Sequence, residues 1–185
     1  MLRASIGFRA HSGWAVAVAV AGGKAVERRR IELCDWLVPG SAQLYHAAAS
    51  LPLPAAATYL RRCETASAAM AEQALRKLAA DLAARGYRAA RCVVLTGAGR
   101  PLGELAKTLA SHPLIHTAEG EFYRATIAAA CRRCGLPVFG TPERELCTRL
   151  AEGPALRAGL GPPWGRDEKL CALAAAERRP GKELS

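Results

Sequence analysis

Hydrophobic and small residues alternate along the first 35 positions of the chain. In residues 13–21 (GWAVAVAVA), valine and alanine follow each other strictly, which is typical of a β-strand with one face of larger side chains. Residues 4–11 and 25–35 alternate more loosely on either side, and the GGK of residues 22–24 favours a hairpin turn. The pattern therefore predicts an antiparallel meander of three strands.

After a connector at 36–54 that contains three prolines, the hydrophobic positions change to helical spacing. Residues 55–86 contain neither proline nor glycine before Gly86, which predicts one long helix that ends at this glycine. Shorter hydrophobic segments then follow one another. We expect strands at 91–97 and 136–142, and helices at 101–112, from Thr117 to about Cys134, at 143–153 and at 166–179.

This order of elements predicts an α/β fold in which a three-strand antiparallel meander is followed by alternating helices and parallel strands. We assign residues 1–185 to a single domain, with 180–185 as a loose tail, because this length is enough for one sizeable core. No apolar run reaches the roughly 18 residues that cross a bilayer. No signal-peptide pattern opens the chain, so we expect a cytoplasmic protein with no membrane partner.

Charge and cysteine content narrow the classes of partner. Lysine and arginine outnumber aspartate and glutamate by 26 to 16, a formal net charge of +10. This basicity favours nucleic acid or a phosphorylated ligand, although a GC-rich genome would produce the same composition. The 7 cysteines are odd in number and dispersed, which fits reduced thiols. Cys131 and Cys134 form a CxxC, but a zinc site would need two further ligands, so we interpret them as free thiols.

The order of elements resembles the ribonuclease H-like superfamily. Residues 5–20 also look like the first hairpin of its RuvC-type nucleases, in which Gly13 and Trp14 take the place of a small residue and an aromatic after the first turn. The resemblance implies the fold of that superfamily. It also implies a nuclease in which three or four carboxylates hold two divalent metal ions.

The carboxylates implied by this resemblance are incomplete here. The middle of the first strand offers Gly7, Phe8 and Arg9 and no acid, and the end of the fourth strand has Thr96 or Gly97. The remaining acids are Glu64 on the long helix, and Asp167 and Glu168 at the start of the last one. A cation at Arg9 would repel a metal ion, so a divalent metal is not favoured, no metal ligand is named, and the cofactor and any enzymatic activity stay open.

Residues 95–110 (LTGAGRPLGELAKTLA) resemble the glycine-rich segment of short-chain dehydrogenases. Pro101 replaces the middle glycine of that motif, and no tyrosine of the chain has a lysine four residues on, so we do not expect a dinucleotide site. Two interpretations stay open: a tight strand-to-helix turn, or an anion pocket made by amides at a helix N-terminus. The candidate residues of such a pocket are Thr96, Gly97, Gly99 and Arg100.

Residues 114–135 hold the densest group of chemically active side chains. His116 and Glu119 are candidate acid–base partners, and Glu121 adds a second carboxylate. Gly120 early in a helix costs about 1 kcal/mol relative to alanine, which would make sense if a ligand or another backbone came close. A second interpretation is that the acids match the helix dipole and form a surface ion pair.

We therefore predict a nucleic-acid-associated protein of ribonuclease H-like fold that lacks the full two-metal carboxylate set. One alternative is a protein that binds a nucleotide or phosphorylated small molecule on the loop 97–103. Another is a scaffold or subunit of an assembly, with a second copy of the chain as a candidate partner. The candidate catalytic residues are Glu64, His116, Glu119, Glu121 and Asp167. The candidate ligand- or phosphate-binding residues are Arg9, His11, Thr96, Gly97, Gly99, Arg100 and Gly120.

Overall fold

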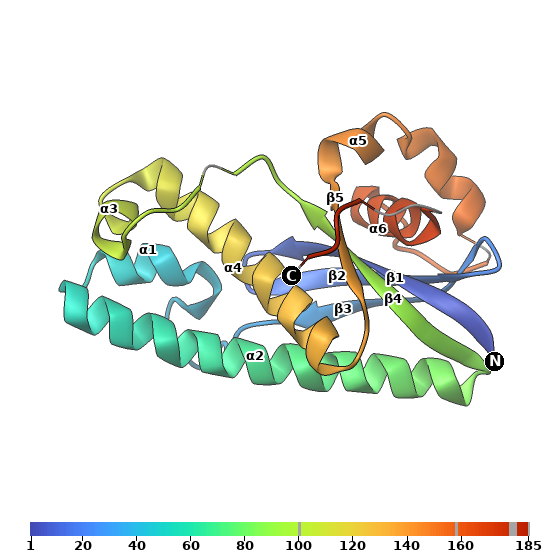
Figure 1. Ribbon diagram of the computed structural model, residues 1–185, viewed down its shortest axis with the longest axis horizontal. Helices are drawn as coiled ribbons and strands as arrows, with labels where there is room; N and C mark the ends of the chain where they lie inside the picture. Colours follow the sequence, from blue (N-terminus) through green and yellow to red (C-terminus); the bar gives the residue numbers. More distant parts are fainter. Residues whose placement is uncertain (100, 158, 178–180, 185) are drawn as a thin grey trace.

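A five-stranded sheet in the order β3-β2-β1-β4-β5 forms the centre of the computed structural model, which describes residues 1–99, 101–157, 159–177 and 181–184 (Figure 1). Strands β1 to β3 form an antiparallel meander, β4 pairs parallel with β1, and β5 pairs parallel with β4. The strands are β1 Leu2–His11, β2 Trp14–Ala21, β3 Lys24–Glu32, β4 Tyr87–Thr96 and β5 Val138–Pro142. The α/β fold class predicted from the sequence is confirmed.

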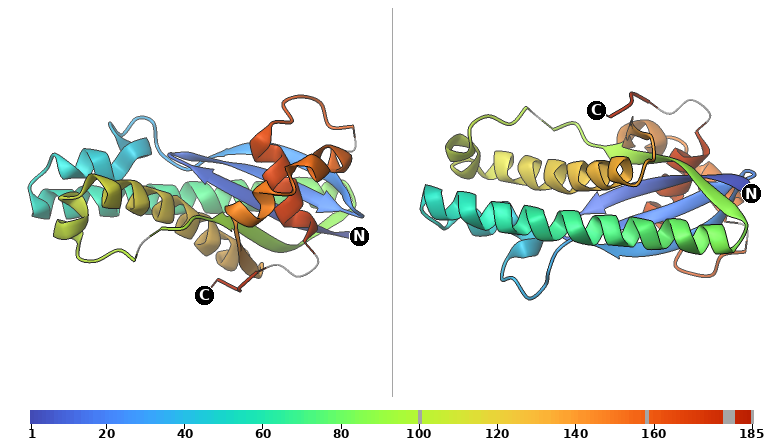
Figure 2. Two further views of the ribbon diagram at one scale, coloured as in Figure 1. Left: turned by 90° about the horizontal axis from the view of Figure 1, so that it is seen from above. Right: turned by 60° about the horizontal axis from the view of Figure 1, so that its bottom comes forward.

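Helices cover both faces of the sheet. Figures 1 and 2 show α2 and α4 side by side on one face, with α6 on the other. The helices are α1 Leu44–Ala49, α2 Leu53–Ala84, α3 Leu105–Leu109, α4 His112–Arg133, α5 Glu143–Cys147 and α6 Arg166–Ala176, with 3-10 turns at Ser41–Gln43 and Leu150–Leu156. None of the helices in these described ranges is long and apolar enough to span a membrane.

The alternation along β2 explains how both faces are buried. Ala15, Ala17 and Ala19 belong to the core shared with α2 and α4, and the three valines of β2 belong to the core shared with α6. The small side chains leave room for bulky residues of the first core, such as Leu78 and Tyr123, whereas the valines meet the alanine-rich α6. Both alternating sets are therefore inside, and β2 is a central strand covered on its two sides.

The depth at which α6 packs on β1 depends on Gly7. A Cβ atom at this position would lie 1.9 Å from the backbone oxygen of Cys171 in α6. Only glycine lets the helix approach the strand this closely. The close approach brings Asp167, in the first turn of α6, to the end of β1.

The start of α4 differs from the expected start at Thr117. The helix begins five residues earlier, at His112, after Ser111 in extended backbone. Pro113 lies in the first turn, where its fixed φ angle suits a helix and its missing amide proton is not needed. Thr117 is already inside the helix, and its hydroxyl donates to the carbonyl oxygen of Pro113 at 3.1 Å.

Residues 181–184, which belong to the expected tail at 180–185, contact the sheet. This segment runs along the edge strand β5, with a β-bridge between Phe139 and Glu183 and two further backbone hydrogen bonds of 2.8 and 2.9 Å. The side chain of Leu184 packs against the main core. The segment therefore covers the backbone groups of an edge strand, which would otherwise be open to pairing.

Candidate functional site

Three parallel strands bring candidate side chains to one edge of the sheet. Because β1, β4 and β5 run parallel, their carboxyl ends lie together. Arg9 and His11 stand near the end of β1, Thr96 ends β4, and Glu143 directly follows β5. The first turn of α6 adds Asp167. In α/β proteins, ligands bind at this edge of the sheet.

Arg9 is the centre of a hydrogen-bonded network at this edge. Its Nε and Nη2 atoms donate to the two carboxylate oxygens of Glu143, both at 3.0 Å, and its Nη1 atom donates to Oδ1 of Asp167 at 2.8 Å. The Nε2 atom of His11 lies 2.7 Å from Oδ2 of Asp167 and donates its proton to that oxygen. The four side chains are 22–28% exposed, so their charges interact more strongly than on an open surface.

The charges in this network stabilise each other. Burial favours a higher pKa for Glu143, but the hydrogen bond and charge of Arg9 outweigh it and lower the pKa. Burial also disfavours the charged form of Arg9, and the two carboxylates more than offset this, so the pKa of Arg9 is raised. A second guanidinium, from Arg166, lies 3.6 Å from Glu143. Two cations that face two carboxylates leave no excess negative charge to attract a divalent metal ion.

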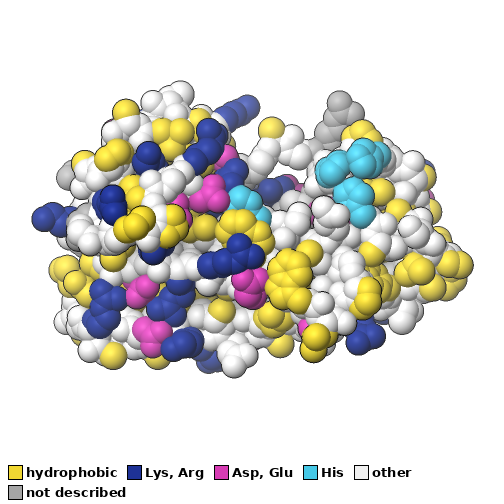
Figure 3. All heavy atoms as spheres, turned by 180° about the vertical axis from the view of Figure 1, so that it is seen from behind, with side chains coloured by type: hydrophobic (Ala, Val, Ile, Leu, Met, Phe, Trp, Pro, Cys, Tyr) yellow, Lys and Arg dark blue, Asp and Glu magenta, His cyan; other side chains and the backbone are white. Residues whose placement is uncertain are grey.

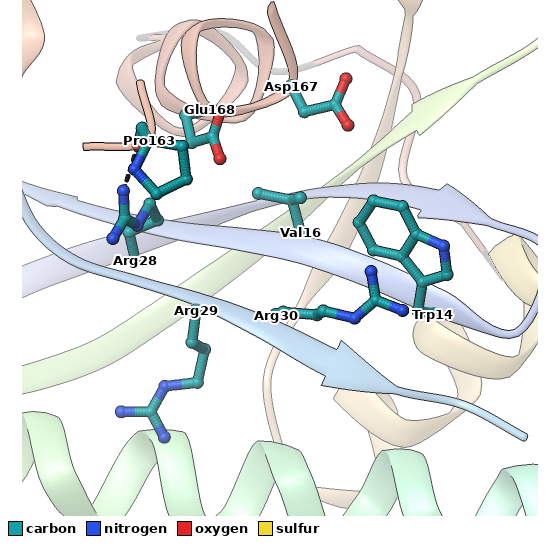
Figure 4. A pocket seen from close by; sticks show the side chains of 8 residues that line it. All are labelled: Trp14, Val16, Arg28, Arg29, Arg30, Pro163, Asp167 and Glu168. Carbon is teal, nitrogen blue, oxygen red and sulfur yellow. Dashed lines mark hydrogen bonds between the residues drawn. The ribbon is translucent and has the colours of Figure 1, made fainter. Parts of the chain in front are cut away.

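A pocket of about 360 Å³ opens beside the network. Figure 4 shows Asp167 on the helix side of this pocket, and Trp14 and Arg30 on the strands. The Trp14 ring stacks with His11, with ring centroids 4.0 Å apart and planes 9° apart, and the guanidinium carbon of Arg30 lies 3.9 Å from the centre of the indole. The indole therefore lies between the His11 ring and Arg30, which fixes the guanidinium of Arg30 at the pocket, where it suits an anionic partner.

The glycine-rich loop borders the network from another side. A pocket of about 400 Å³ is lined by Thr96, Gly97, Ala98, Pro142, Glu143, Arg144 and Cys147. Glu143, which binds Arg9, therefore also faces this loop. The expected helix at 101–112 begins only at Leu105 and is five residues long, so the loop does not open directly into a helix. The helix N-terminus that the anion-pocket interpretation places at this loop lies instead at Leu105, and Arg100 lies outside the described residues.

Gly120 of α4 has a structural role next to this loop. A Cβ atom there would lie 3.0 Å from Nη2 of Arg124, and one at Gly97 would lie 3.5 Å from the same guanidinium. The guanidinium of Arg124 also donates to Oε1 of Glu121 at 2.7 Å, and this carboxylate lies against Gly99. Gly120 thus makes room for an arginine that lies between the helix and the loop.

The candidate carboxylates lie in different parts of the structure. Asp167 belongs to the network around Arg9. Glu121 pairs with Arg124 on α4. Glu64 is exposed on α2 and lines a groove with Glu121 that does not include Asp167. The groups that could share one reaction centre at the sheet edge are therefore Asp167 and the groups around Arg9.

The expected pairing of His116 with Glu119 does not form. Glu119 is 4% exposed, and its Oε1 atom instead accepts a hydrogen bond from Nδ1 of His46 at 2.9 Å. The Nε2 atom of His116 lies 3.0 Å from Nε2 of His112. The earlier helix start explains the difference, because it places His112 one turn before His116 on the same helix.

Glu143 is a member of the Arg9 network that the sequence did not single out. It lies at the junction of β5 and α5, inside a segment expected as an ordinary helix at 143–153. The available signal was its position directly after a strand that ends at the same edge as Thr96. Glu168 differs from its neighbour Asp167, because its carboxylate accepts from the amide of Gly165 at 2.8 Å and caps α6.

The cysteines belong to the packing of the molecule. All seven are free thiols, as the sequence indicated. Cys131 is buried, and this neighbouring thiol together with burial raises the pKa of Cys92. Cys134, at the end of α4, is half-buried. The CxxC is thus part of the contact between α4 and the sheet.

Solved structures with the same arrangement of elements show that the chain has the ribonuclease H-like fold, the fold that the resemblance in the sequence implied. RuvC of Thermus thermophilus in complex with a Holliday junction substrate matches 98% of this chain and 99% of its own, with 12% identity and a TM-score of 0.56. A second structure of Thermus thermophilus RuvC matches the same shares with 10% identity and a TM-score of 0.55. At these identities the likeness shows the fold. No protein-family model and no curated protein sequence matches the chain.

Proposed function

We propose that this chain is a nucleic-acid-binding protein of ribonuclease H-like fold in which Arg9 replaces a divalent metal among the carboxylates. The observation that carries the proposal is the two-pronged contact of Arg9 with Glu143 and its further hydrogen bond to Asp167. A guanidinium matches carboxylate geometry through a rigid fork of donors. Glu143 and Asp167 therefore receive their hydrogen bonds and compensating positive charge from Arg9 of the same chain.

The residues at this edge do not fit the two-metal centre that the fold implies. Such a centre needs several carboxylates free to coordinate metal ions, which activate water and stabilise the leaving oxygen. Here two carboxylates are bound to arginine, and Arg9 places a positive charge between them. The arrangement supports a protein that binds nucleic acid without cleaving it.

Three features support nucleic acid as the partner. The structural neighbour with the higher TM-score is described in complex with a Holliday junction substrate. The formal net charge of +10 would attract a polyanion. The pocket beside the network is lined by three arginines of β3, Arg28, Arg29 and Arg30, and the exposed Arg30 can contact a phosphate or stack on a base.

We expect the protein to bind a fluorescent four-way junction in EDTA, with affinity that falls steeply as salt is added. Three phosphate contacts would weaken binding about 40-fold between roughly 50 and 200 mM salt. Fluorescence anisotropy measures this slope with a junction, a duplex and a single strand of matched length. Arg30→Gln should weaken binding and lower the salt slope by about one phosphate.

Arg76→Gln is the matched control for this variant. Arg30 and Arg76 are both exposed surface arginines that pair with a glutamate, at 2.5 and 2.6 Å, but Arg76 lies on α2 and is not part of the pocket. Arg76→Gln should therefore bind like the unmodified chain. Binding that ignores salt, or no binding to any of the three nucleic acids, would refute the proposal. Thermal stabilisation by a nucleotide alone would favour a ligand on the loop 97–103 instead.

A further inference from the structure

Three of the four histidines of the chain come together where α1 meets the start of α4. His46 lies on α1, His112 is the first residue of α4, and His116 follows one turn later. The ring centroids are 4.5–5.4 Å apart, and one ring nitrogen from each lies within 4.8 Å of the others. Figure 3 shows these histidine side chains gathered at the surface.

We propose that His46, His112 and His116 bind one Zn²⁺ ion. Zinc bonds to imidazole nitrogens are about 2.0–2.1 Å long, so two nitrogens in a tetrahedral site lie about 3.3 Å apart. The Nε2 atoms of His112 and His116 are 3.0 Å apart, close to this separation. The two residues are also four apart on one helix, a spacing that places both rings on one face.

Glu119 orients the third ligand. Its carboxylate accepts from Nδ1 of His46 at 2.9 Å, so the proton resides on Nδ1 and the lone pair of Nε2 is available to a metal. The backbone amide of His46 also approaches the same oxygen, at 3.3 Å. A carboxylate that holds the far nitrogen of a histidine ligand is the usual outer partner in zinc sites. Glu119 is therefore a positioning residue and not a ligand.

The burial of Glu119 provides independent support for a cation. A carboxylate that is only 4% exposed is costly unless positive charge or several hydrogen bonds compensate it. The described part of the chain gives it the ring and the amide of His46. A metal ion on Nε2 would make the Nδ1 proton a stronger donor and would place positive charge on the other side of the ring.

The coordination would leave one position open. His112 and His116 are exposed, and His46 is half-buried, so solvent can reach the ion. Three histidines and a water molecule form the ligand set of zinc sites that keep an exchangeable position. Zinc would also join α1, a helix of six residues, to the long α4. This site does not depend on the proposed binding of nucleic acid.

Zinc titration of the full, reduced chain without an affinity tag tests the proposal. After removal of metal with EDTA, competition with a chromogenic chelator should show one tightly bound Zn²⁺ per chain. His116→Ala and His46→Ala should each weaken binding roughly 100-fold or more, because each removes one of three ligands. Circular dichroism of the metal-free variants shows whether they remain folded, and the exposed His116 is the safer replacement.

Three further variants keep the outcome unambiguous. Glu119→Gln should weaken zinc binding about 10- to 100-fold without removing a ligand. His11→Ala, which replaces the fourth histidine, and Cys134→Ser, which removes half of the CxxC, should leave stoichiometry and affinity unchanged. The proposal is overturned if the unmodified chain takes up no zinc at micromolar concentrations. It is also overturned if the histidine variants bind like the unmodified chain, or if Cys134→Ser abolishes binding.

Discussion

Replacement of Gly7 by alanine is expected to destabilise the protein by about 3 kcal/mol or more, at the upper end of the range for an overpacked core. The new Cβ atom would lie 1.9 Å from the backbone oxygen of Cys171 and 2.8 Å from its carbonyl carbon. A backbone cannot rotate away as a side chain can, so α6 must shift as a whole. The shift would also move Asp167 away from Arg9. Urea unfolding followed by circular dichroism measures the loss.

Gly103→Ala is the matched control for this experiment. Gly103 lies in an exposed segment, and a Cβ atom there would meet no atom within 4 Å. It should unfold at the same urea concentration as the unmodified chain, or slightly higher, because alanine reduces the freedom of the unfolded chain. An unchanged midpoint for Gly7→Ala would mean that α6 does not pack on β1 at the depth described.

Arg9→Met is expected to cost about 2 kcal/mol at neutral pH. Removing one partner of a fully buried ion pair costs about 3–5 kcal/mol, and we expect less here because these side chains are about a quarter exposed. Methionine retains much of the volume of arginine but removes the cation that Glu143 and Asp167 share, so Glu143 keeps only Arg166 at 3.6 Å and Asp167 keeps only His11. Both carboxylates then lose a charged hydrogen-bond donor.

The cost of Arg9→Met should shrink as the pH falls. The pKa of Glu143 is lowered in the folded protein, so the stability from its contact with Arg9 is present above the ordinary glutamate range and is lost below it. In the variant this stabilisation is absent, and protonation relieves the repulsion between the acids. The difference in unfolding free energy should therefore be largest near pH 7 and should shrink as the pH falls below the ordinary glutamate pKa and through the lowered pKa of Glu143.

Arg29→Met provides the matched control. Arg29 has the same exposure as Arg9, 22%, and also contacts two acids, Glu27 and Asp81. Without Arg29, Glu27 keeps Arg85 at 2.8 Å and Asp81 keeps Lys77 at 3.2 Å. Without Arg9, Glu143 keeps only the more distant Arg166, at 3.6 Å, and Asp167 keeps only the ring of His11. The loss of unfolding free energy in Arg29→Met should be well below that in Arg9→Met. Equal losses of unfolding free energy would show that the network around Arg9 stabilises the fold no more than the ion pairs of Arg29 do.

The alternation of hydrophobic residues predicts the sheet because it is a local signal. The strict valine and alanine pattern of β2 indicates a strand, and its hairpin turn indicates antiparallel pairing. The start of α4 is harder to predict from the sequence. Threonine is a common helix-capping residue, so Thr117 suggests a start there, whereas the helix begins after Ser111 with Pro113 in its first turn. The pairing of residues 181–184 with β5 is a long-range contact that no local pattern marks.

The candidate site was only partly visible in the sequence for the same reason. The sequence identifies Arg9, His11 and Asp167 as candidates. The contacts of Arg9 and His11 with Glu143 and Asp167 join residues 134 to 158 positions apart, so no local pattern predicts that Glu143 belongs to the network. The spacing of four residues between His112 and His116 is typical of metal ligands on a helix, although no metal ligand was predicted from the sequence. Their partner His46 lies in the proline-rich connector, and only the packing of α1 on α4 reveals it.

Incubation of an end-labelled four-way junction with the protein and Mg²⁺ or Mn²⁺ distinguishes a guanidinium-filled edge from a working nuclease. We expect the junction to stay intact at protein concentrations that bind it fully, because Arg9 already holds Glu143 and Asp167. Cleavage that requires the metal ion and is lost in Asp167→Asn would contradict this and would show that the carboxylates can leave Arg9 to coordinate metal.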